Sequence, residues 1–257
     1  MQSSSNQIET QKRLYIIREI DKYVADSFLS GLLVTGSLAW GKNRSVIESS
    51  DVDFYLLAPS LDAFKNSLEG LPNIPSQTKK ILTKMLDYTD KPVDTRSIKT
   101  NIGPYFGAIY FFTEKGISQL VEQFNRSGSK FFKNLRPHNF SQTKEYKGVK
   151  GNKINFTTPI IKARNSDNLW IRTDPLFLVE SKEFFGSIFL SHLLFGEAFT
   201  DKNKAIYKAQ IQARKFLKSI LPHDEERAFV LFKNYLPRIE RMDNKIINDL
   251  FNSIWQS

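Results

Sequence analysis

Two aspartates separated by one residue, Asp51 and Asp53, are the pair in this sequence best suited to chemistry. They open the segment DVDFYLLA, whose other residues are apolar and predict a buried β-strand. Alternate side chains of a strand point to the same face, so the two carboxylates are expected side by side. Adjacent carboxylates repel each other and are costly to desolvate. The spacing therefore predicts a positively charged group between them.

Together with an upstream segment, this pair resembles the catalytic core of the nucleotidyltransferase superfamily typified by DNA polymerase β. In that family an apolar stretch ends in Gly-Ser or Gly-Gly, and an Asp-x-Asp with apolar flanks follows after a short connection. Here Gly36 and Ser37 end the segment GLLVTGS, and 13 residues separate Ser37 from Asp51. The resemblance covers residues 30–100 and predicts a nucleotidyltransferase-like sheet with flanking helices.

The resemblance also implies an activity. A nucleoside monophosphate would pass from a nucleoside triphosphate to an acceptor hydroxyl, with release of pyrophosphate; no residue selects the base, so ATP is the default. Mg²⁺ prefers oxygen ligands, and carboxylates on one strand face, here Asp51 and Asp53, hold two such ions around an in-line displacement. Gly36 would let the backbone approach the triphosphate, while the Ser37 hydroxyl and nearby N–H groups would donate to its oxygens.

The family needs a third metal-binding carboxylate on a neighbouring strand. Asp94, in the segment KPVDTRSIK, is expected to supply it and to polarise the attacking hydroxyl. Its alternative role is that of a turn residue after Pro92. Glu114 is the rival candidate, but it lies where a strand is expected to end and a helix to begin, which favours a capping role. Arg96, two positions after Asp94, would share its strand face and could pair with it or with phosphate.

The chain departs from the family pattern at Trp40, in GSLAWG, where many relatives carry an arginine in GSxARG. The contact of that arginine with the triphosphate is therefore expected from Lys42 or Arg44. Trp40 itself could stack on a base, although packing in the core is the commoner fate of a tryptophan.

Composition excludes several other classes of protein. The chain has no cysteine and only three histidines, which excludes disulfides and thiolate zinc sites and fits a cytoplasmic protein. Its apolar runs are too short to span a membrane, and the N-terminus lacks the pattern of a secretory signal. Neither the P-loop nor the Rossmann glycine pattern occurs.

Charge is concentrated in one stretch. Residues 126–172 contain eleven Lys or Arg against two acidic residues, a net of +9 out of +10 for the chain. Such a stretch favours anionic partners, so tRNA or another RNA is the expected acceptor. The alternatives are a small-molecule hydroxyl, as in antibiotic nucleotidyltransferases, and a non-catalytic nucleic-acid-binding protein on the same fold. A solvated lysine-rich loop explains the stretch equally well without any partner.

The order of elements predicts a mixed α+β fold followed by a helical part. The expected division is a catalytic domain over residues 1–125, a basic connecting region over 126–172 and a helical domain over 173–257. Helices are expected at 8–29, 60–70, 76–89, 115–124, 176–199, 201–221, 224–236 and 243–255, and strands at 31–37, 51–58, 91–99 and 107–114.

Overall fold

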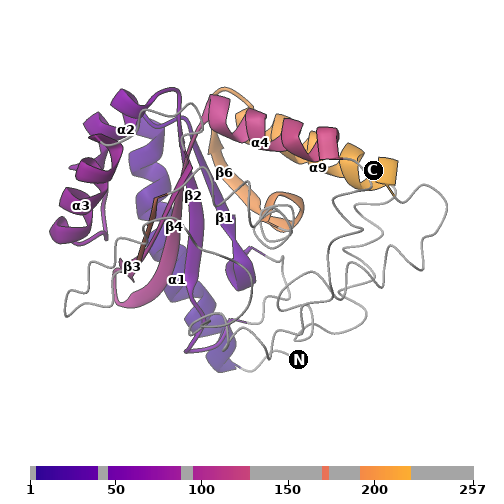
Figure 1. Cartoon of the computed structure of the whole chain (residues 1–257). Coiled ribbons are helices and arrows are strands. Elements are labelled where there is room, and N and C mark those ends of the chain that lie inside the picture. Colours follow the sequence, from indigo (N-terminus) through magenta and orange to yellow (C-terminus); the bar gives the residue numbers. More distant parts are fainter. Residues whose placement is uncertain (1–3, 40–45, 88–94, 128–169, 174–191, 221–257) are drawn as a thin grey trace, which may run out of the picture.

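The structure, a computed structural model, describes residues 4–39, 46–87, 95–127, 170–173 and 192–220. These residues form one six-stranded mixed sheet with helices on both faces (Figure 1), which confirms the expected α+β class. The strand order is β5-β3-β4-β2-β1-β6. Strands β2 and β4 are parallel, and every other pair of neighbours is antiparallel.

The first four strands and the helices follow the predicted order with small shifts, whereas the strands at residues 170–173 and 197–201 were not expected. The strands are β1 (Gly31–Thr35), β2 (Val52–Ala58), β3 (Thr95–Ile102), β4 (Tyr105–Thr113), β5 (Trp170–Thr173) and β6 (Glu197–Asp201). The helices are α1 (Ser4–Asp26), α2 (Leu61–Leu68), α3 (Ser76–Asp87), α4 (Glu114–Ser127) and α9 (Ala205–Ile220), with a short 3₁₀ turn, η1 (Gly36–Leu38), directly after β1.

Helix α1 covers the sheet through one stripe of side chains. Ile17, Ile20 and Val24 recur at helical spacing and are fully buried. The apolar residues at the two ends of the helix expected over 8–29 do not join this stripe, because Ile8 is 54% exposed and Phe28, beyond the end of α1, is 68% exposed. The helix therefore contacts the sheet mainly through its middle and C-terminal turns.

Strand β2 divides its side chains between the two faces of the sheet. Val52, Phe54 and Leu56 belong to the main core, which they form with residues of α1, α2 and α3. Alternation sends Asp53 and Tyr55 to the opposite face. Figure 1 shows α1, α2 and α3 on one side of the sheet and α4 and α9 on the other. Asp53 thus lies on the α4–α9 face.

The expected helix over residues 176–199 differs from the structure in its last part. Residues 192–195 are helical, but Glu197–Asp201 form strand β6, which pairs with β1. Gly196 lies at the change, where a Cβ atom would collide with the carbonyl oxygen of His192. A segment from the second half of the chain thereby extends the sheet that β1 and β2 begin.

The other expected elements of the second half are described only in part. Of the basic stretch, residues 126–127 end α4 and 170–172 belong to β5, while the rest lies outside the described residues. The helices expected at 224–236 and 243–255 also lie outside them. Among the helices that the structure describes, none combines the length and the apolar character that a membrane crossing needs.

Candidate nucleotide and metal site

Gly36 and Asp53 bring the two sequence motifs together. Strand β1 ends at Thr35, which pairs with Asp53 of β2, and Gly36 follows with a φ of 67°. This left-handed conformation favours glycine, and it turns the chain into η1. A Cβ atom on Gly36 would lie 3.3 Å from Asp53 Oδ2. The missing side chain therefore lets the backbone of Gly36 approach the carboxylate.

The carboxylate of Asp53 is oriented by both neighbouring strands. Its Oδ1 accepts a hydrogen bond of 2.9 Å from the backbone N–H of Ala108 in β4. Its backbone carbonyl accepts a hydrogen bond of 3.2 Å from the Thr35 hydroxyl in β1. Oδ1 is thus directed to one strand, while Oδ2 lies toward Gly36 on the other. Asp53 as a residue is partly buried.

Asp51 is the residue directly before β2, and it is partly buried as well. Continued alternation from Asp53 would place both carboxylates on one face at the N-terminal end of the strand. Only Asp53 lies within β2, so the side-by-side arrangement of the two carboxylates stays a prediction.

Ser37, the residue after Gly36, has a buried hydroxyl. The residue is 6% exposed, and its hydroxyl has no hydrogen-bond partner among the described residues, a state that it shares with Ser30 and Ser67. Burying a hydroxyl without a partner costs free energy, so such groups usually call for an explanation. A ligand oxygen at the Gly36–Ser37 turn would satisfy this donor.

An aromatic cluster next to Asp53 has no local signal in the sequence. Tyr55, two residues further along β2, stacks on Tyr110 of β4 with ring centroids 4.4 Å apart. Its hydroxyl lies 2.7 Å from Nδ1 of His192. Burial raises the pKa of Tyr55 well above its ordinary value of 10.0, and Tyr110 and Asp53 raise it further. The period of β2 could have placed Tyr55 beside Asp53, but nothing in the sequence pairs it with His192.

The remaining predicted residues are not brought to this site within the described residues. Asp94, Lys42 and Arg44, together with Trp40, lie outside the described residues. Arg96 pairs through its backbone with Phe111, three positions along β4 from Ala108.

Glu114 lies at the far end of the sheet from Asp53. It is the first residue of α4, directly after Thr113, which pairs with the last residue of β2. Its carboxylate accepts a hydrogen bond of 2.7 Å from the side chain of Asn203. The register of β2 and β4 therefore removes Glu114 as a partner of the Asp pair and leaves it at the start of the helix.

The two carboxylates fit Mg²⁺ that arrives with a nucleotide. Mg²⁺ is usually held by one or two carboxylates together with substrate phosphates, and a cage made of protein ligands alone is uncommon. Within the described residues, no group of three or more Asp, Glu, His or Cys side chains is placed to hold a metal. Asp51 and Asp53 match the first arrangement, since they supply oxygen ligands and leave coordination positions for phosphate.

No protein-family model matches the chain, and no curated protein matches it.

Proposed function

We propose that this protein is a Mg²⁺-dependent nucleotidyltransferase. It transfers a nucleoside monophosphate from a nucleoside triphosphate, ATP by default, to an acceptor hydroxyl and releases pyrophosphate. We further propose a nucleotidyltransferase-type catalytic domain based on residues 1–125, a basic region over 126–172 and a mainly helical part over 173–257. The last two segments also contribute β5 and β6 to the sheet of the first.

One observation carries the proposal: Gly36 lies against Asp53 Oδ2 across strands β1 and β2. A glycine with positive φ, a neighbouring carboxylate and a buried hydroxyl without a partner among the described residues meet at one end of the sheet. A carboxylate alone would be explained by solvation, and a glycine alone by a turn. Their contact is explained when an anionic group and a cation bind there together.

Each residue then has a defined task. Asp51 and Asp53 would hold Mg²⁺, which when bound neutralises charge on the phosphate oxygens during the displacement. The Gly36–Ser37 turn would hold the triphosphate, with the Ser37 hydroxyl donating to a phosphate oxygen. The acceptor oxygen attacks the α-phosphorus, the bond from that phosphorus to the bridging oxygen breaks, and pyrophosphate leaves. Asp94 would take the proton of the acceptor hydroxyl.

RNA is the acceptor that we propose. The support is electrostatic, because residues 126–172 carry a net of +9 and follow the Asp pair in the chain. Phosphate contacts dominate the affinity of proteins for nucleic acids, and lysine and arginine supply them.

The direct test is transfer of label from α-labelled nucleoside triphosphates to a mixture of RNA and small-molecule acceptors, with Mg²⁺ and with EDTA. Transfer should require Mg²⁺ and should fall at least about a hundredfold in Asp53→Asn, because the lost charge acts on the transition state. The asparagine keeps an oxygen that can accept the Ala108 N–H. Asp62→Asn, an exposed aspartate in the first turn of α2, is the matched control and should leave transfer unchanged. Full activity in Asp53→Asn would refute the assignment of the site.

A further inference from the structure

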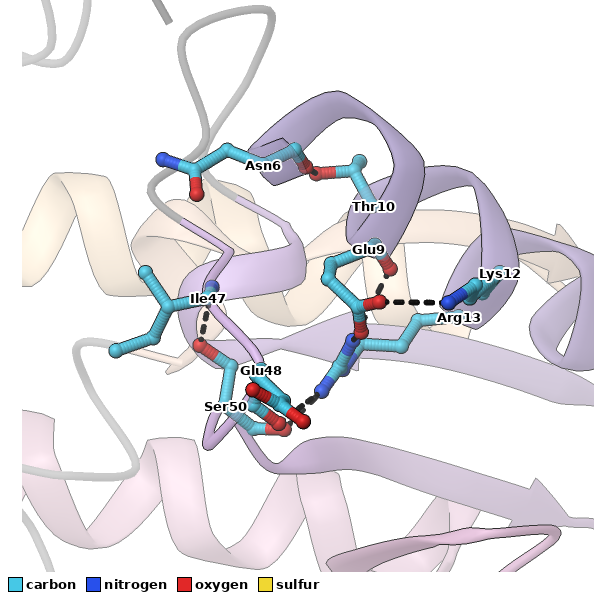
Figure 2. Close-up of polar contacts among 8 residues, drawn as sticks. All are labelled: Asn6, Glu9, Thr10, Lys12, Arg13, Ile47, Glu48 and Ser50. Carbon is cyan, nitrogen blue, oxygen red and sulfur yellow. Dashed lines mark hydrogen bonds and ion pairs between the residues drawn. The ribbon is translucent and has the colours of Figure 1, made fainter. Parts of the chain in front are cut away.

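Arg13 lies at the centre of a buried polar cluster, although its charge would suit the protein surface. It belongs to α1, and its side chain is fully buried. Figure 2 shows its guanidinium pointing at the turn that precedes Asp51. Nη2 donates to the carbonyl of Glu48 at 2.8 Å, and Nε donates to the carbonyl of Ser50 at 3.1 Å. One side chain thus holds two carbonyls of the same turn.

The turn itself is closed by its own hydrogen bonds. The backbone N–H of Ile47 donates to the Ser50 hydroxyl at 3.0 Å, and the N–H of Ser50 donates to the Ile47 carbonyl at 2.9 Å. Arg13 therefore binds a hydrogen-bonded turn, residues 47–50, and ties it to α1. The next residue along the chain is Asp51.

The charge of Arg13 is compensated within its own helix. Nη1 donates to the Glu9 carboxylate at 2.6 Å and to the Glu9 carbonyl at 3.1 Å. Exposed Lys12 also pairs with Glu9, at 2.8 Å. Hydrogen bonds from Lys12 and then Arg13 lower the pKa of Glu9. A buried and paired guanidinium is not available to bind phosphate, so its task is to fix the surrounding backbone.

Arg13 also contacts β4, the strand that pairs with β2. Its guanidinium carbon lies 4.0 Å from the centre of the Tyr105 ring. Tyr105 is the first residue of β4, the strand in which Ala108 donates to Asp53. The same side chain therefore braces the entry to β2 and the start of β4.

We propose that Arg13 is a positioning residue for Asp51 and Asp53. By holding residues 47–50 against α1 and Tyr105, it fixes the backbone from which both carboxylates project. Its consequence for catalysis rests on the proposed function, but its effect on the backbone can be measured without any activity.

Arg13→Lys tests this, because lysine keeps the charge but lacks the planar fork that reaches both carbonyls. Amide hydrogen exchange of peptides covering residues 47–54 should accelerate about tenfold or more, while peptides from the middle of α4 should not change. In transfer assays, the Mg²⁺ concentration for half-maximal rate should rise and kcat should fall, each by about 10- to 100-fold, with little change in the KM for the nucleotide.

Lys12→Gln is the matched control, because Lys12 shares the Glu9 carboxylate but is exposed; exchange and the Mg²⁺ requirement should both stay at the wild-type level. Ser50→Ala is the second variant if Arg13→Lys fails to fold. It removes the hydroxyl that accepts the Ile47 N–H, so it should also accelerate exchange over residues 47–54 and raise the Mg²⁺ requirement.

Two outcomes decide the matter. Unchanged exchange over residues 47–54 in a folded Arg13→Lys or Ser50→Ala protein overturns the positioning role. Faster exchange in a protein whose wild type shows no nucleotidyl transfer supports the positioning role and counts against the proposed function alone.

Discussion

Gly36 and Asp53 are in contact across the pair of strands β1 and β2, since a Cβ atom on Gly36 would lie 3.3 Å from Asp53 Oδ2. This distance is shorter than most real contacts of a Cβ atom, so an added side chain at position 36 would displace the carboxylate oxygen. Gly36 also has a φ of 67°, which side chains other than hydrogen disfavour. The position of the Asp53 carboxylate and the conformation of the turn therefore both depend on glycine at position 36, which has no side chain.

Replacing this glycine should harm activity more than stability. Gly36→Ala should lower the free energy of unfolding by about 1–2 kcal/mol, because alanine is strained at positive φ. It should also lower kcat/KM for transfer by about tenfold or more, because the methyl group displaces Asp53 Oδ2. Urea unfolding and the transfer assay measure the two effects.

The control for backbone strain is Gly103→Ala. Gly103 has a φ of 59°, and a Cβ atom there would lie 2.9 Å from Ile16 Cδ1, away from the carboxylates. It should lose a similar amount of stability and keep its activity. Equal losses of activity in both variants would mean that Gly36 acts only through the fold.

Ser37→Ala tests whether the Ser37 hydroxyl binds a ligand or stabilises the fold. The Ser37 hydroxyl is buried and has no partner among the described residues, so its removal should leave the free energy of unfolding unchanged or slightly higher. If it donates to a phosphate oxygen, the KM for the nucleotide should rise about tenfold, the equivalent of one hydrogen bond to a charged group.

Ser67→Ala is the matched control for Ser37→Ala. Its hydroxyl is also buried without a partner among the described residues, but it lies in α2 on the other face of the sheet. It should change neither stability nor KM. A clear loss of stability in Ser37→Ala, with an unchanged KM, would assign that hydroxyl to the fold.

The local part of this site could be predicted from the sequence, because local geometry determines it. Alternation along β2 separates Asp53 from its apolar neighbours Val52 and Phe54 whatever the rest of the chain does. Ser60 directly precedes α2, a position at which serine is a favoured cap, and its hydroxyl accepts the Ala63 N–H at 3.2 Å. Such features need only a few consecutive residues.

The other parts depend on contacts between distant residues. Strand β6 pairs with β1, although its sequence continues an apolar run that is typical of a buried helix. His192 lies 137 residues from Tyr55, and Arg13 lies 35 residues from Glu48. No periodicity encodes such pairs, since each residue alone fits an ordinary surface or core position. The failure of the Glu114 alternative has the same cause, because only the strand register places it at the far end of the sheet.

Tyr55 should make stability fall at alkaline pH. Its pKa is raised in the folded state by burial first and by Tyr110 and Asp53 next. The unfolded chain therefore releases this proton at a lower pH than the folded protein does. The contribution of Tyr55 is fully present below pH 10.0, its ordinary pKa, and declines above it, with a slope of at most about 1.4 kcal/mol per pH unit.

Tyr55→Phe should remove that slope and cost about 1 kcal/mol at neutral pH, because the hydrogen bond with His192 is lost. Urea unfolding between pH 8 and 11 measures both effects. Tyr207→Phe, at a residue that is 55% exposed, is the control and should keep the wild-type slope. Identical pH profiles for Tyr55→Phe and the wild type would contradict the buried position of the phenol.

Salt should weaken binding to RNA steeply if the basic stretch supplies phosphate contacts. The logarithm of the affinity for unfractionated tRNA should fall linearly with the logarithm of salt concentration, by about 0.7–0.9 for each phosphate neutralised. Replacing Lys147, Lys150 and Lys153 together by glutamine should reduce that slope by about 2–3 if each contacts one phosphate. Filter binding between 50 and 200 mM KCl measures it.

The position of the lost charges, and not their number, should decide this result. Lys22, Lys115 and Lys208 are exposed on α1, α4 and α9, outside the basic stretch. Their joint replacement by glutamine removes the same net charge, but it should leave the salt slope near the wild-type value, because a counterion is released only where a phosphate is contacted. Equal slopes in both triple variants would show that the stretch over residues 126–172 acts only through net charge. A weak affinity that hardly responds to salt in the wild type would favour a small-molecule acceptor, because such a hydroxyl needs no row of phosphate contacts.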